Sequence, residues 1–134
     1  MAVNPDLVGR SYPRTVAVEA TAERVAAFAR AVKASDESRV PPTFAIVVQQ
    51  ASLDLLLTDP TTGIVLERVV HGEQRFAYQR DIVVGDVLTG ELTITGVRAL
   101  GPAAMVTAET VIRDAADTTV ATATSVLVVG SGDE

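Results

Sequence analysis

The N-terminal part of the chain passes from a strand pattern to a helix pattern. Polar and apolar side chains alternate over residues 14–19, which predicts a first β-strand. Apolar side chains then recur at helical spacing over about residues 22–33, which predicts an amphipathic helix. These apolar positions are Val25, Phe28, Ala29 and Val32. Thr21 can cap this helix, and Glu23 lies in its first turn, where the helix dipole favours an anion.

Residues 43–58 form a strongly apolar segment that admits two interpretations. Residues 46–48 would suit a strand, whereas residues 49–57 have the propensity of a helix. Pro42 fits the first turn of a helix, and the Asp-Pro pair at residues 59–60 would end it. We therefore expect one central helix, and so apolar a helix must be largely buried. A strand here would contradict the fold class predicted below.

From residue 64 onward the pattern is that of β-strands. Strands are predicted over residues 64–80, 87–100, 105–114 and 118–129. Turn-forming residues separate them at 81–86, 101–102 and 116–117. The order of elements predicts an α+β domain with an antiparallel sheet of about five strands, the last four forming a meander. Such a sheet can wrap the buried helix and leave its other face to solvent or a partner.

Length and composition fit one folded domain. The chain has 134 residues, enough for one hydrophobic core, and its 48% of hydrophobic residues argues against disorder. Residues 1–129 are therefore taken as a single domain. Residues 130–134 are small and polar and are predicted to be a disordered tail.

Charge and residue content exclude several classes of function. The net charge of -6 argues against binding to the nucleic-acid backbone. With no Cys and one His, neither a metal nor a cofactor is expected. The first residues have no basic or apolar region typical of a signal peptide, and no apolar run is long enough for a membrane span. We therefore expect a cytoplasmic protein with no membrane partner.

Several short motifs resemble one family when taken in order. The sequence reads LVGRSYP at residues 7–13, PPTF at 41–44, HGEQRFAYQR at 71–80 and VGDVL at 84–88. Their order and spacing resemble the N-terminal domain of the MaoC-like dehydratases, although Asp81 stands where that family usually has a proline. The nearest group is the actinobacterial set of short MaoC-like proteins, which includes the A subunit of the mycolic-acid pathway (3R)-hydroxyacyl-ACP dehydratase.

The resemblance implies a hot dog fold, in which an antiparallel sheet curls around a central helix. Hot dog chains mostly form dimers, with joined sheets and with clefts between the protomers. The implied activity is that of a (3R)-hydroxyacyl-ACP or -CoA dehydratase, also described as enoyl hydratase 2, acting on acyl thioesters. In the dehydratases of this group, one hot dog chain carries the catalytic Asp and His while the other shapes the acyl tunnel.

The loop that carries catalysis in the family is altered in this chain. Catalytic members have a G-D-x-N-P-x-H pattern before the central helix, because dehydration needs a base and an acid close together. Here Asp36 falls on the aspartate, but Ser38 replaces the asparagine and Arg39 the proline. Pro41 stands in the place of the histidine, and a proline side chain cannot titrate. The chain alone is therefore not predicted to be a competent hydratase, and Asp36 is expected to be a solvated loop acid.

His71 is the weak remaining candidate for acid–base chemistry. It could reach the cleft from the sheet, or it could be a polar residue at a strand bend beside Gly72 or at a dimer seam. Glu73 and Gln74 follow it on opposite faces of the predicted strand.

The predicted central helix offers candidates for substrate binding and for a different activity. Thr43, Phe44, Val47 and Val48 could line an acyl tunnel, or pack in the core. Some hot dog thioesterases direct water with an acid or a Gln near this helix. Gln49, Gln50 and Asp54 are the candidates here, although polar positions at its outer side or ends explain them equally well.

Three functional hypotheses result. The first is a non-catalytic, acyl-tunnel subunit or degenerate homologue of a (3R)-hydroxyacyl-ACP or -CoA dehydratase, paired with a catalytic hot dog chain. The second is a homodimer that binds acyl thioesters without chemistry, and the third is an acyl-CoA thioesterase. The missing histidine favours the first over a self-sufficient hydratase. Fold alone does not decide among the three hypotheses.

Overall fold

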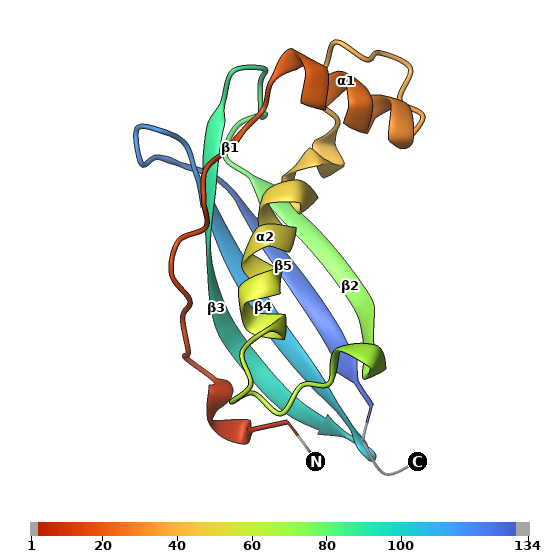
Figure 1. The fold of residues 1–134 in the computed structure, drawn as a ribbon, viewed down its shortest axis with the longest axis vertical. Helices are drawn as coiled ribbons and strands as arrows, with labels where there is room; N and C mark the ends of the chain where they lie inside the picture. Colours follow the sequence, from red (N-terminus) through yellow and green to blue (C-terminus); the bar gives the residue numbers. More distant parts are fainter. Residues whose placement is uncertain (1–2, 131–134) are drawn as a thin grey trace.

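The structure is a computed structural model that describes residues 3–130 of the chain. One antiparallel sheet and a helix along its inner face dominate it (Figure 1). The elements are β1 (Val18–Glu19), α1 (Ala22–Ala31), a 3-10 turn (Pro42–Ala45), α2 (Ile46–Leu57), β2 (Val69–Tyr78), β3 (Val87–Leu100), β4 (Ala103–Arg113) and β5 (Thr119–Val129). The expected α+β architecture, a sheet of five strands around a central helix, is confirmed. The expectation of a tail at residues 130–134 falls mostly outside the described residues.

The predicted helices are both present. Thr21 caps α1 as expected, since its Oγ1 accepts the backbone N–H of Arg24 at 3.1 Å. The helix ends near Val32, and Lys33 adopts a positive φ of 59°. The apolar segment that followed Pro42 is helical throughout, first as the 3-10 turn and then as α2. The strand interpretation of residues 46–48 is therefore wrong.

The strand order differs from the predicted four-strand meander. Only β3, β4 and β5 form a meander, and β2 pairs with β5 at the far edge, giving the order β1-β3-β4-β5-β2. The chain therefore crosses the end of the sheet between β2 and β3. Arg80 holds this crossover with two bonds to Asp86, at 2.8 and 3.0 Å, and one to Asp114 at 3.1 Å. With β2 on the far side of β5, the sheet has strands on both sides of α2 (Figure 1).

Two strand boundaries also differ from the prediction. The first strand contracts from residues 14–19 to Val18–Glu19. Backbone N–H groups of Gly9, Tyr12 and Thr15 donate to the carbonyls of residues 94, 92 and 90. The segment thus advances three residues for every two of β3, so it cannot form a regular ladder. In the predicted strand 64–80, the first residues form a loop and a 3-10 turn, and pairing starts at Val69.

Small side chains on the sheet let α2 lie close to it. The inner faces of β4 and β5 carry small buried residues, namely Ala108, Thr110, Ala121, Ala123 and Ser125. On β3, a Cβ added at Gly90 would lie 2.9 Å from Cγ2 of Thr110 and 3.2 Å from Cγ1 of Val48. The close approach of α2 to β3 therefore requires a residue without a side chain at position 90.

The N-terminal segment covers the β3 edge of the sheet and is tied to the far end of α2. The Tyr12 hydroxyl donates to Oδ2 of Asp59 at 2.7 Å, and Arg10 lies 3.1 Å from the same oxygen. Hydrogen bonds, first from Tyr12 and then from Thr61, hold the pKa of Asp59 well below its usual range. Burial, followed by the bond to Asp59, raises the pKa of Tyr12 to about 12.

The opposite edge, formed by β2, is open. β2 pairs only with β5, and within residues 3–130 no strand lies on its outer side. Gln79 donates its backbone N–H to Val120 at 2.8 Å, so by alternation the backbone groups of residues 74, 76 and 78 point away from β5. These outward backbone groups are thus available for pairing with another strand.

Among residues 3–130, no helix is both long and apolar enough to cross a membrane.

Candidate functional site

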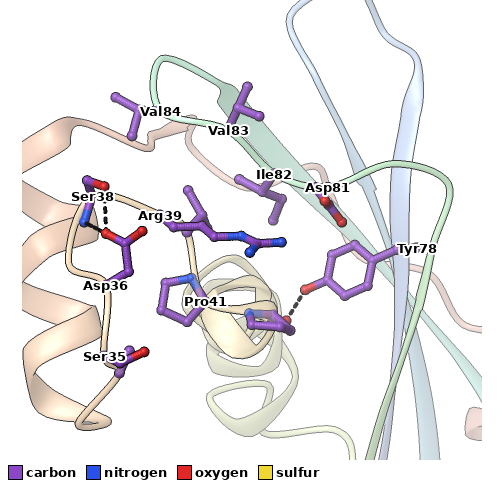
Figure 2. Close-up of a pocket in the computed structure, with 13 residues that line it drawn as sticks. Ser35, Asp36, Ser38, Arg39, Pro41, Tyr78, Asp81, Ile82, Val83 and Val84 are labelled. Carbon is purple, nitrogen blue, oxygen red and sulfur yellow. Dashed lines mark hydrogen bonds between the residues drawn. The ribbon is translucent and has the colours of Figure 1, made fainter.

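Two hollows flank the N-terminal end of α2. The first, here called the loop pocket, lies between residues 34–42 and residues 78–84 and has a volume of about 790 Å³ (Figure 2). The second, here called the edge groove, lies between α1, the start of α2 and β2, and has a volume of about 650 Å³. The sequence-predicted candidates divide between these two hollows and the core.

The loop pocket contains the positions at which the family motif places its catalytic residues. Asp36 and Pro41 both line it (Figure 2). The Asp36 carboxylate accepts the Ser38 hydroxyl at 2.6 Å and the Ser38 backbone N–H at 3.0 Å. These bonds lower the pKa of Asp36, so near neutral pH it is an ionised acceptor closing a local turn. Pro41 is buried at the start of the 3-10 turn and contributes neither a donor nor a titrating group.

The loop pocket is also lined by Arg39, Tyr78 and Asp81. Tyr78 donates its hydroxyl to the carbonyl of Pro42, and burial raises the pKa of that hydroxyl. Arg39 extends across the pocket toward Tyr78 (Figure 2). The described lining of the loop pocket thus offers carboxylates, a guanidinium and a phenol with a raised pKa, but no imidazole.

The edge groove combines an apolar wall with a polar end. Its apolar residues are Phe28 and Val32 from α1, Ile46 from α2 and Phe76 from β2. Thr43, His71 and Gln74 supply polar groups. The groove therefore brings together His71 and Thr43, which were candidates on separate grounds in the sequence.

A β-bulge shapes the polar end of the edge groove. The pairing register of β2 shifts between His71 and Glu73, so Gly72 is the extra residue. The bulge places His71 and Gln74 on the same face, whereas residues three apart in a regular strand point to opposite faces. Nε2 of His71 lies 2.9 Å from Oε1 of Gln74, which also accepts the Ser125 hydroxyl at 2.5 Å.

The other residues considered for substrate binding lie mainly in the core. Phe44 is 1% exposed and packs edge-to-face on Phe28 with ring centroids 5.3 Å apart. Val48 is fully buried, and Val47 is half-buried against the same cluster. Only Thr43 of the four lines the edge groove. Sequence reasoning missed Ile46 and Phe76 as groove residues, because their apolar character predicted only burial.

The residues considered for thioesterase chemistry do not meet at either hollow. Gln49 is fully buried and donates its Nε2 to the carbonyl of Ala123 at 3.1 Å. Its Oε1 has no hydrogen-bond partner among the described residues. Gln50 donates to Asp54 at 3.0 Å on the exposed side of α2. None of the three is among the described residues that line either hollow.

Comparison with known proteins agrees with the sequence motifs. A family model described as "FAS1-like, dehydratase domain region" matches residues 6–123. A UPF0336 protein of Leifsonia xyli subsp. xyli is 48% identical over 147 residues, which cover 98% of each chain.

Solved structures show the same fold at low sequence identity. The chain is similar to the truncated HadBC (3R)-hydroxyacyl-ACP dehydratase complex of Mycobacterium tuberculosis, with 23% identity, a TM-score of 0.75, and coverage of 92% of this chain and 97% of that one. It is also similar to a MaoC-like dehydratase, with 21% identity and a TM-score of 0.80, over 95% of this chain and 43% of the other. The predicted hot dog fold and the resemblance to short MaoC-like proteins are thereby confirmed.

Proposed function

Since the chain belongs to the family of FAS1-like dehydratase domain regions, we propose that it is the non-catalytic, acyl-binding subunit of a (3R)-hydroxyacyl-ACP or -CoA dehydratase. Its relatives by fold include dehydratases of (3R)-hydroxyacyl thioesters. The proposal adds to this family assignment a division of labour, with the chemistry supplied by a second hot dog chain.

The chemistry missing from the loop pocket is the observation that carries the proposal. Removal of water from a 3-hydroxyacyl thioester needs a base for the proton on C2 and an acid for the departing hydroxyl. Oδ1 of the ionised Asp36 carboxylate accepts both bonds from Ser38, and Pro41 offers no proton. We therefore expect a catalytic partner to supply the acid–base pair.

The open β2 edge supports a partner chain. A ten-residue edge strand with free backbone groups is a surface that proteins usually cover or blunt. A second hot dog chain that added its own strand there would extend the sheet and lie beside the edge groove. The HadBC (3R)-hydroxyacyl-ACP dehydratase, which this chain resembles in fold, is a complex, and this fits a heteromeric arrangement.

The edge groove supports acyl binding. Phe28, Val32, Ile46 and Phe76 offer an apolar surface that suits the chain of an acyl thioester, with Thr43 at its polar end. Acyl-CoA and acyl-ACP are both compatible with this groove. A cytoplasmic location is part of the same proposal.

Purification of the tagged protein from its own host tests the proposal. We expect a second hot dog chain with an intact Asp…His loop to co-purify, and the pair to hydrate 2-enoyl thioesters while this chain alone does not. Asp36→Asn in this chain is the matched control and should leave the activity of the pair unchanged, since Asp36 has no catalytic role. Activity of the isolated chain that is lost in Asp36→Asn would contradict the proposal.

Recovery of the chain only with itself would also contradict the subunit proposal. Extraction of bound ligand and an acyl-CoA hydrolysis assay would then separate the two remaining hypotheses. Retained ligand without turnover indicates an acyl-binding homodimer, and hydrolysis indicates a thioesterase.

A further inference from the structure

We infer that the edge groove selects an acyl-type ligand by a hydrogen bond from a neutral donor on that ligand to the His71 ring. The inference rests on the proposed acyl-binding function and adds to it the residue that recognises the ligand. A hydroxyl on the acyl chain and an amide N–H of a pantetheine arm are two sources of the same chemistry.

The hydrogen bonds around Gln74 determine which nitrogen of His71 carries its proton. Oε1 of Gln74 can only accept, and it accepts the Ser125 hydroxyl at 2.5 Å. His71 must therefore donate from Nε2 across the 2.9 Å contact with the same oxygen. In the neutral His71 ring, Nδ1 is then the one nitrogen that can accept a hydrogen bond. His71 itself lines the groove.

The arrangement runs from the interior of the protein to its surface. Ser125 is fully buried on β5, Gln74 is half-buried on β2, and His71 is exposed. The bulge at Gly72 is what brings His71 onto the face of Gln74. These bonds hold the His71 ring in one orientation and leave Nδ1 without a partner among the described residues.

The charges around the groove indicate that the partner is neutral. No Lys or Arg is among the described residues that line it, so a phosphate or a free carboxylate has no counter-charge there. The one lining carboxylate, that of Glu73, lies 3.1 Å from Nε of Arg75. The apolar wall, including Val32 at 47% exposure, accommodates an uncharged chain.

Calorimetric titration of the chain, alone and with its partner, tests the inference with three probes: 3-hydroxylauroyl-CoA, lauroyl-CoA and CoA. His71→Phe keeps a ring but removes the acceptor, and should weaken binding about three- to tenfold. His71→Asn keeps an acceptor near the position of Nδ1 and should restore most of the affinity. Glu109→Gln, exposed on β4 and outside the groove, is the matched control and should bind as the wild type does.

The probes distinguish the two donors. If the hydroxyl is the donor, only 3-hydroxylauroyl-CoA loses affinity in His71→Phe. If a pantetheine amide is the donor, all three probes lose affinity by a similar factor. Equal affinities of folded His71→Phe and wild type for every probe would overturn the inference, as would the absence of binding by any probe to the wild type.

Failure of this inference can be told from failure of the proposed function. An active complex whose ligand affinities ignore His71 would retain the proposed function and remove the inference. A chain that has no catalytic partner but still binds acyl-CoA through His71 would retain the inference and remove the proposed function.

Discussion

The two edges of the sheet differ in what covers them. At the β3 edge, the N-terminal segment covers the strand. Backbone N–H groups of Gly9, Tyr12 and Thr15 donate to carbonyls of β3, and β1 pairs with the first residues of β3. At the β2 edge, no described residue pairs with the outer side of the strand, and the edge groove lies on its inner face. The chain itself therefore covers one edge of the sheet, whereas the other edge is open among the described residues and is where the proposed ligand and partner would bind.

The same contrast divides the start of α2. Phe44 and Val48 pack in the cluster that includes Leu88 of β3, whereas Thr43 and Ile46 line the edge groove. Neighbouring residues of one apolar segment thus have different surroundings. The predictions below follow this contrast from the largest expected effect to the smallest.

Phe44→Ala should lower the free energy of unfolding by about 3–5 kcal/mol, because it leaves a cavity in the buried cluster beside Phe28. Urea unfolding measures the loss. Thr43→Ala, next to it but exposed in the groove, should stay within about 0.5 kcal/mol of the wild type. A small loss in Phe44→Ala with a large loss of ligand affinity would instead assign Phe44 to the binding surface.

Gly90→Ala should cost about 1–3 kcal/mol, because the new Cβ would lie 2.9 Å from Cγ2 of Thr110 and 3.2 Å from Cγ1 of Val48. Gly96→Ala on the same strand is the control. Its Cβ would meet Thr107 at an ordinary 3.7 Å, so the stability should be equal or slightly higher. Thermal unfolding of both variants measures the difference, and equal losses would contradict the proposed tight approach of α2.

The double substitution Val70→Asp and Ala77→Asp should weaken association with the partner chain at least tenfold, or about 1.4 kcal/mol. Both residues are exposed on β2, so unfolding of the isolated chain should change by no more than about 0.5 kcal/mol. Sedimentation of the mixed chains measures the association. An unchanged association constant would mean that the partner does not bind along the open edge.

Tyr12→Phe should lower stability at neutral pH by about 1 kcal/mol, because it removes the 2.7 Å bond to Asp59. The Tyr12 pKa is raised in the folded state to about 12, so its contribution is complete below about pH 10, the ordinary value, and is lost as the pH rises through 12. The variant should lose less stability than the wild type over that alkaline range. Unfolding measured from neutral to alkaline pH tests this difference.

Tyr12→Phe should also change how the free energy of unfolding depends on pH in the acid range. The pKa of Asp59 is depressed in the folded state, so its contribution is present above about pH 4 and is lost as the pH falls through the folded-state value. The Tyr12 bond is the largest cause of that depression, so Tyr12→Phe should lose less stability on acidification. Identical acid profiles for the two proteins would contradict a coupled pair.

Local signals predicted much of the fold and part of the candidate site. Thr21 begins α1 because its side chain can satisfy a free N–H of the first turn, a property of neighbouring residues alone. The order of the motifs predicted the family, and Pro41 showed without any coordinates that the histidine of the family motif is replaced. His71 was visible as the one histidine, but its partners were not.

The sequence by itself determined the helices, most strand positions, the family and the presence of Pro41 where the family motif has a histidine, because these depend on residue type and on spacing within a few positions. Only the tertiary structure decided the place of β2 in the sheet, since a strand pattern does not say which edge it joins. It also decided the environment of His71. The His71 ring contacts Gln74, and Gln74 accepts a hydrogen bond from Ser125, which lies 51 residues further along the chain. Contacts over such separations arise from the packing of whole elements, and no local pattern encodes them.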